Sequence, residues 1–207
     1  GIFLLLALFA FMTYLDSALP SYHIAIKVIK KASVYALVAV SMNLLNGFTG
    51  LFSLGQAGFM MLGAYTYAIF TIPTDARLSV YKYYTTVNAA GEEVGGLVQF
   101  VLPVGIAIVL AGIVAAIFAF FIGLPVLRLK SDYLAIATLG VSEIIRALIS
   151  APQMDRITNG SYGLKSIPGF SSIFTPAIIS AICIGIMIML INSSYGRAFK
   201  AIRENDI

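Results

Sequence analysis

The chain has 207 residues, of which 60% are hydrophobic and 11% are charged, and its mean hydropathy is +0.97. Soluble domains carry about 25% charged residues, so the composition excludes an ordinary soluble protein and indicates one that crosses the membrane several times. The net charge is +4, but the 13 Lys and Arg residues gather at the ends of apolar runs, where they set orientation in the membrane. We therefore expect no nucleic-acid partner.

The sequence contains no cluster of His, Cys and carboxylate residues of the kind that most catalytic chemistry needs. Cys183 is the only cysteine and His23 the only histidine, so no internal disulfide, zinc site or catalytic triad can form. No GxxxxGK[ST] phosphate-binding loop occurs either. We expect a protein that is not an enzyme and that binds no metal and no cofactor of its own.

Charge-free intervals along the chain predict about six membrane segments, because one span needs roughly 20 apolar residues and one interval is long enough for two passes. We interpret the first run as a span and not a signal peptide, because it lacks a basic region before its apolar stretch. The expected segments of this all-α polytopic protein are 1–15, 32–46, 51–70, 97–124, 132–150 and 175–191.

A glycine-rich stretch at residues 43–58 interrupts the longest apolar interval. In hydrocarbon an unpaired backbone group is costly, so such a stretch persists only where it is buried in protein or lines a cavity. We therefore expect a broken helix near residues 46–56. Four polar side chains there either contact the solute pathway or bond the broken helix, and these are Asn43, Asn46, Ser53 and Gln56.

Small residues recur at every fourth position of the segment at 97–124, a pattern typical of a face against which another membrane helix packs closely. A groove for a ligand is the alternative. The residues are Ala107, Ala111, Ala115, Ala119 and Gly123.

Two opposite charges lie within the expected helix at 132–150. Glu143 and Arg146 are three residues apart, so they share a helix face and can pair. We expect a structural or gating ion pair, with direct transport chemistry as the alternative. Arg stays protonated at physiological pH, so it cannot carry a proton-coupling step.

The basic residues of the C-terminal tail place that tail in the cytoplasm, which puts the loops at 71–96 and 151–174 outside. Lys27, Lys30 and Lys31 then fall on the outer side, against the positive-inside tendency. A broken helix or a contact with anionic lipid would account for this exception.

Three separated segments resemble one family, the membrane-spanning subunits of ABC importers for branched-chain amino acids and for related small polar solutes such as urea and amides. The segments are NLLNGFTGLFSLGQAGFMMLGAYTY, LRLKSDYLAIATLGVSEIIR and SYGRAFKAIRENDI, which begin at residues 43, 127 and 194. The chain differs by Gln56, where the family often has His, and by Ser131, where Gly is usual. It also ends where the family continues, so we expect a fragment of a longer permease.

By this resemblance the tail at 194–207 is the coupling segment that docks on an ATPase subunit. A short helix with apolar residues on one side and charges around them suits such a contact. The alternative is an ordinary basic flank that only sets the orientation of the preceding span. The residues concerned are Gly196, Arg197, Phe199, Lys200, Ile202, Arg203 and Glu204.

The resemblance further implies that residues 1–207 form a single permease domain in the plasma (inner) membrane. It implies four kinds of partner: ABC ATPase subunits that bind the ATP, a second related permease subunit, an extracytoplasmic solute-binding protein and membrane lipids. The expected function is ATP-driven import of leucine, isoleucine or valine by alternating access. Two alternatives stay open, namely a urea or amide substrate, and a secondary transporter driven by an ion gradient, which would leave the tail unexplained.

Overall fold

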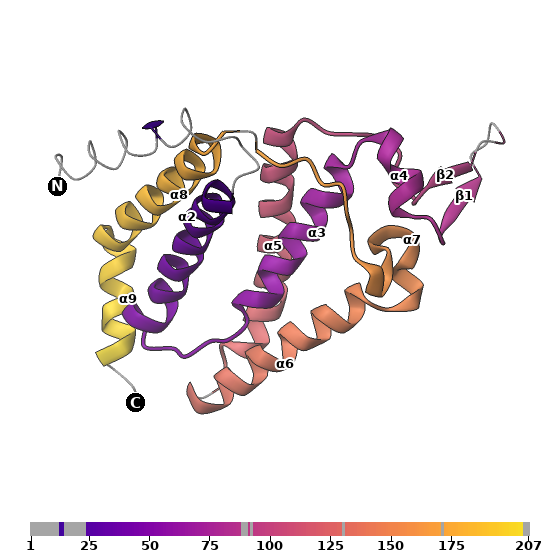
Figure 1. Cartoon of the computed structure of the whole chain (residues 1–207). Helices are drawn as coiled ribbons and strands as arrows, with labels where there is room; N and C mark the ends of the chain where they lie inside the picture. The colour runs from indigo at the N-terminus through magenta and orange to yellow at the C-terminus, as the bar shows by residue number, and fades with distance from the viewer. Residues whose placement is uncertain are drawn as a thin grey trace. The chain divides into compact units, whose positions relative to one another are not determined.

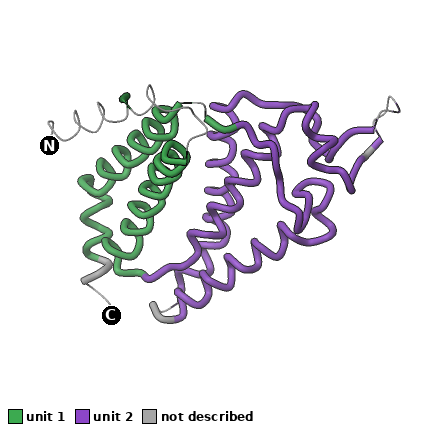
Figure 2. The backbone as a smooth tube through the Cα atoms, viewed as in Figure 1, with its two compact units in different colours: residues 1–51, 169–207 green, residues 52–168 purple. Residues whose placement is uncertain are grey.

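The computed structural model describes residues 13–14, 24–87, 91, 93–129, 131–170 and 172–204, without the side chains of residues 86, 131, 132 and 202–204. Apart from Thr13 and Tyr14, the expected first span lies outside the described residues, as do residues 205–207. The chain divides into two compact units, residues 1–51 with 169–207 and residues 52–168 (Figure 2).

The first unit consists of helices. Its elements are α2 (Ile24–Asn43), the π-helical turn η1 (Leu44–Phe48), α8 (Phe174–Asn192) and α9 (Ser194–Glu204) (Figure 1). Helix α2 packs along α8, and η1 contacts α9. At the other end of α2, Nζ of Lys30 donates a hydrogen bond to the carbonyl oxygen of Phe170, 2.7 Å away and just before α8 begins. Helices α2 and α8 therefore run parallel.

The second unit contains three longer helices and a small hairpin. The elements are α3 (Gln56–Thr71), α4 (Thr74–Val80), β1 (Thr85–Val87), β2 (Glu93–Gly95), α5 (Val104–Val126), α6 (Ser131–Ile149), η2 (Pro152–Met154), α7 (Asp155–Thr158) and η3 (Gly160–Tyr162). The strands pair antiparallel, with Thr86 opposite Val94. Helix α3 packs on both α5 and α6. The expected all-α architecture is thus modified by one hairpin in a connecting segment.

The beginning of the small-residue stripe of α5 is a packing face, as predicted. Ala107 is fully buried and Ala111 is 7% exposed, whereas Ile106 and Val109 on the other side are 57% and 61% exposed. A Cβ added to Gly63 of α3 would lie 3.8 Å from the carbonyl oxygen of Ala111. The two backbones approach closely because neither residue has a bulky side chain.

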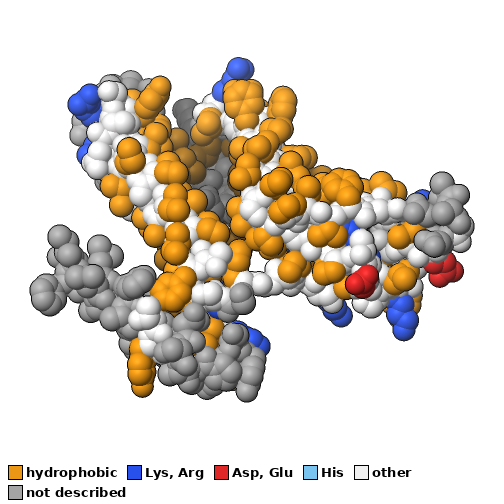
Figure 3. Space-filling model, turned by 90° about the horizontal axis from the view of Figure 1, so that it is seen from above, with side chains coloured by type: hydrophobic (Ala, Val, Ile, Leu, Met, Phe, Trp, Pro, Cys, Tyr) orange, Lys and Arg blue, Asp and Glu red, His pale blue; other side chains and the backbone are white. Residues whose placement is uncertain are grey.

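Two helices among the described residues are long and apolar enough to cross a membrane, α5 and α8. The pair formed by Tyr133–Ile149 and Pro152–Thr158, bent by 55°, is a third candidate if it counts as one span. Helix α3, with 16 residues, is shorter than the roughly 20 residues that a straight span needs. On the face seen in Figure 3, hydrophobic side chains predominate, which suits contact with lipid or with other membrane helices.

The three basic residues Lys27, Lys30 and Lys31 lie in the first turns of α2. Two of these lysines have partners. Lys30 bonds to the Phe170 carbonyl, and Nζ of Lys31 lies 5.6 Å from the centroid of the Tyr35 ring.

Candidate functional site

The predicted break in the longest apolar interval is present: helical structure ends at Phe48 and resumes at Gln56. On the side of the first unit, Thr49 donates a hydrogen bond from Oγ1 to the carbonyl oxygen of Leu45. Its Oγ1 also accepts one from the amide of Leu51, 3.4 Å away. Gly50 follows with φ of +72°, a conformation that favours glycine. One hydroxyl and one glycine therefore terminate the π-helical turn.

Two of the expected pathway residues belong to this first side. Asn43 ends α2 and is exposed, and its side chain lies directly over the backbone of Gly47, leaving no room there for a Cβ atom. Asn46 is half-buried within the π-helical turn. The π-helical turn follows α2 directly and is the last helical element before the break.

On the side of the second unit, the extended segment before α3 is held by side-chain oxygens. Ser53 is 8% exposed, and its Oγ accepts a hydrogen bond from the amide of Gly55 at 3.4 Å. The amide of Leu54 donates to Oγ1 of Thr138 on α6 at 3.0 Å. Gln56 is half-buried at the first position of α3. Ser53 thus bonds the broken backbone, which is the structural role weighed for it above.

Thr138 was not predicted as a site residue, although it lies in one of the segments that carry the family resemblance. Its hydroxyl at mid-helix in an apolar run was the available signal. The sequence alone could not show that the amide of Leu54 is its partner, because the two residues are far apart along the chain.

We expect Thr138→Val to destabilise the protein by about 1–3 kcal/mol, because it keeps the shape of the side chain and leaves the Leu54 amide without an acceptor in an apolar surrounding. Thr66→Val is the matched control. Among the described residues, the Thr66 hydroxyl bonds to the carbonyl of Leu62 in its own helix, so its removal leaves no backbone amide without an acceptor. Thermal unfolding of the two variants in detergent checks the difference, and equal melting temperatures would contradict it.

Glycine allows α3 to cross α6 at very short distance just after the break. A Cβ added to Gly58 would lie 2.8 Å from Cα of Ser142 and 3.1 Å from Cδ1 of Ile145. Ser142 is 7% exposed and turns its hydroxyl to the carbonyl of Leu139, 2.7 Å away. The crossing therefore fixes the start of α3 on the middle of α6.

The expected ion pair of α6 is formed. Oε2 of Glu143 lies 2.8 Å from Nη2 and 2.9 Å from Nε of Arg146. The side chains are 57% and 65% exposed, respectively. On the same face a Cβ at Gly140 would meet nothing within 4 Å. Two exposed charges at mid-helix are costly against lipid, so this face suits water or a polar partner helix.

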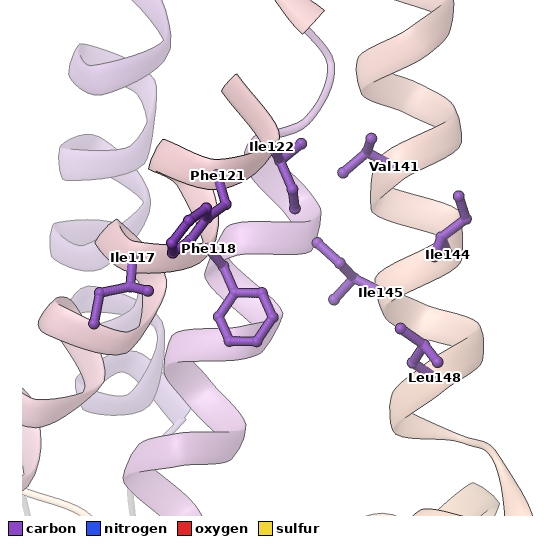
Figure 4. Close-up of a pocket in the computed structure, with 8 residues that line it drawn as sticks. All are labelled: Ile117, Phe118, Phe121, Ile122, Val141, Ile144, Ile145 and Leu148. Carbon is purple, nitrogen blue, oxygen red and sulfur yellow. The ribbon is translucent and has the colours of Figure 1, made fainter. Parts of the chain in front are cut away.

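An apolar groove of about 590 Å³ lies between α5 and α6 (Figure 4). None of the side chains around it has a polar atom, so it offers nothing to bind the charged groups of an amino acid. We therefore place no solute site there. The lining residues are Ile117, Phe118, Phe121, Ile122, Val141, Ile144, Ile145 and Leu148.

The tail forms the expected short helix, α9. Ser193 caps it, because its Oγ accepts a hydrogen bond from the amide of Tyr195 at 3.2 Å. Gly196 is buried against the end of α8, where a Cβ would overlap the carbonyl oxygen of Ile191. Phe199 is half-buried, while Arg197 and Lys200 are exposed. The side chains of Ile202, Arg203 and Glu204 lie outside the described residues.

Residues 71–96, expected as an outer loop, contain α4 and the hairpin, and within the second unit they contact the part of the other expected loop that ends at Pro168. Arg77 of α4 is 2% exposed and donates hydrogen bonds to the carbonyls of Ile69, Ile72 and Phe100 at 3.2, 3.1 and 3.1 Å. Burial lowers the pKa of Arg77, because it removes the cation from water. The guanidinium satisfies carbonyls at the end of α3 that the helix leaves unpaired.

Tyrosines join the segment at 71–96 to the segment at 151–168. Oη of Tyr81 donates to the carbonyl of Ile157 at 2.7 Å, and the rings of Tyr83 and Tyr162 stack with centroids 5.3 Å apart. A side-chain hydrogen bond to Asp155 raises the pKa of Tyr84. We call residues 72–100 and 152–164 together the cap.

Residues 24–207 match the family model described as the permease component of branched-chain amino acid transport systems. The high-affinity branched-chain amino acid transport system permease protein LivM of Salmonella typhimurium is 35% identical over 135 residues, and LivM of Escherichia coli is 36% identical over 136 residues. A probable LivM of Methanocaldococcus jannaschii is 28% identical over 202 residues.

The chain is shorter than these relatives. The matches cover 65% of this chain but 25% of the two bacterial proteins, and 84% of this chain but 54% of the archaeal one. No solved structure matches the chain.

Proposed function

We infer that this chain, which belongs to the family of permease components of branched-chain amino acid transport systems, forms part of the pathway by which an ATP-driven importer moves leucine, isoleucine or valine across the membrane. The chain is a membrane transport permease and not an enzyme. The observation that carries the ATP-driven part of the proposal is α9, a capped helix with exposed basic residues that directly follows the apolar span α8.

The proposed topology keeps about six membrane segments, which are residues 1–15, α2 with η1, α3, α5, α6 and α8. With α9 in the cytoplasm, α8 runs inward, and so does the parallel α2. Lys27, Lys30 and Lys31 then lie outside, where the hydrogen bond of Lys30 to Phe170 and the contact of Lys31 with Tyr35 support their placement. On this topology the cap also lies outside, and residues 1–207 act as one permease domain.

The proposed partners follow from this orientation. ABC ATPase subunits bind the ATP and dock on α9, while a second related permease subunit supplies the other half of the pathway. An extracytoplasmic solute-binding protein delivers the solute to the cap, whose stacked Tyr83 and Tyr162 are 67% and 60% exposed. This chain itself binds no cofactor.

The pathway is proposed to pass the break and the exposed face of α6. Asn46 and Gln56 are the better candidates for solute contact, because Ser53 is engaged with its own backbone. Glu143 and Arg146 pair with each other on the α6 face, which supports a gating or water-facing role. Arg146 stays protonated at physiological pH, so it cannot take up and release a proton during transport.

The proposal is tested by reconstituting the assembled transporter in vesicles. Leucine uptake is then measured with ATP supplied on the side of the membrane where the ATPase subunits are bound. We expect Ile202→Asp with Arg203→Glu to abolish ATPase co-purification and to lower uptake about tenfold or more, which corresponds to at least about 1.4 kcal/mol of coupling. Lys165→Glu is the control, because it reverses an exposed charge outside α9.

Three results would redirect the proposal. Unchanged uptake in the double variant would exclude coupling through α9. Uptake that needs an ion gradient but no ATP would favour a secondary transporter. If unlabelled urea competed for uptake and leucine did not, the substrate would be assigned to the urea and amide class.

A further inference from the structure

Helix α9 touches the π-helical turn at the break. Nζ of Lys200 lies 6.0 Å from the centroid of the Phe48 ring, and α9 and η1 are in contact within the first compact unit. Phe48 is the last residue of η1. An ammonium over an aromatic face is attracted by the negative centre of the ring. The tail thus has a second neighbour besides α8.

Within the part of the chain that the structure describes, one side of α9 faces the first unit and the other side is exposed. Gly196 is buried against the end of α8, and Lys200 lies one turn further along, so these two residues share the face that meets the rest of the unit. Arg197, Ala198 and Ala201 are exposed. A cytoplasmic partner can therefore bind α9 without displacing Lys200 from Phe48.

The element that Phe48 ends is one that can change its register. A π turn holds one residue more than an α turn, so interconversion of the two shifts the following residues by about one position. The turn carries Asn46 and ends at the hydroxyl of Thr49 and at Gly50. A displacement of Phe48 would therefore also move the half-buried side-chain amide of Asn46, which belongs to the same turn.

We propose that Phe48 is a positioning residue for transport: movement of α9 is transmitted through the Lys200 and Phe48 contact to the π-helical turn, and so to the polar break. This inference rests on the proposed function, because it takes an ATPase as the partner that moves α9. Phe48 itself contacts neither the ATPase nor ATP in this scheme. Phe48 would transmit the movement of α9 to the π-helical turn, which carries the pathway candidate Asn46.

The test compares Phe48→Leu with the wild-type transporter in vesicles. Leucine keeps an apolar side chain of similar reach but removes the aromatic face. We expect co-purification of the ATPase and its basal hydrolysis to stay within about twofold, while leucine uptake per ATP hydrolysed falls about five- to tenfold. Phe48→Tyr restores the ratio, because it keeps the ring. Phe120→Leu makes the same change on an exposed face of α5 and leaves the ratio unchanged.

A double-mutant cycle with Lys200→Met asks whether the two side chains act as one. Lys200 is exposed, so its replacement does not threaten folding. We expect Lys200→Met to lower uptake per ATP as Phe48→Leu does. The double variant should have the same uptake per ATP as the less active of the two single variants.

The possible outcomes separate this inference from the proposed function. Wild-type uptake per ATP in Phe48→Leu, loss of ATPase binding in that variant, or additive effects in the cycle would each overturn the role of Phe48. Each of these results can occur while the α9 double variant still abolishes coupling. A transporter in which the double variant has no effect would instead fail the proposed function itself.

Discussion

Gly58→Val is expected to prevent α3 from seating on α6 and to yield little folded protein. A Cβ at residue 58 would lie 2.8 Å from Cα of Ser142, and because that neighbour is backbone, no side-chain rotation can relieve the overlap. Overpacking of a tight contact costs typically about 1–3 kcal/mol, which is a large part of the stability of a domain. The yield of monodisperse protein in detergent and its melting temperature measure the loss.

Gly63→Ala is the matched control on the same helix. There a Cβ would meet its nearest neighbour, the Ala111 carbonyl oxygen, at 3.8 Å, an ordinary contact distance. This variant should keep its yield and melting temperature, and it gains from the helix propensity of alanine. A Gly58→Val protein as stable as Gly63→Ala would show that α3 and α6 do not cross as described.

Gly196→Val is expected to uncouple the transporter while the spans still insert and fold. Its side chain would overlap the carbonyl oxygen of Ile191, and Cα of that residue lies only 2.8 Å from the new Cβ. The corner between α8 and α9 must then open, which moves α9 away from η1. We expect uptake per ATP to fall about tenfold, equivalent to about 1.4 kcal/mol, in the vesicle assay.

Gly185→Ala in α8 tests whether this effect belongs to the corner. A Cβ at Gly185 would meet nothing within 4 Å, so the variant should transport normally. The outcome that contradicts the prediction is a Gly196→Val transporter with unchanged uptake and unchanged ATPase co-purification, since the corner would then have no part in placing α9.

The features that depend on local sequence were predicted well. The apolar runs of α5 and α8 and the glycines at the break are readable from composition and spacing alone, whereas the role of Thr49 was not predicted. Gly50, with its positive φ, ends the π turn for a reason that lies in one residue. The small stripe of α5 likewise showed its packing face, because spacing of four is a property of the helix itself.

The features that depend on distant partners were not predicted. The acceptor for the Leu54 amide is Thr138, and the partner of Lys30 is a carbonyl before α8. Neither pairing leaves a periodic signal. The cap was missed for the same reason, since Arg77 and Tyr81 read as charged and polar loop residues until the carbonyls that they bind are known. Tertiary hydrogen bonds thus turned an apparent loop into a folded region.

The guanidinium of Arg77 has a mechanical consequence. It binds carbonyls at the end of α3 and also that of Phe100, which precedes α5. Any tilt of α3 must therefore move the beginning of α5 with it. The ends of α3 and α5 that lie next to Arg77 are therefore tied to each other, while the start of α3 is fixed separately on α6 by the crossing at Gly58.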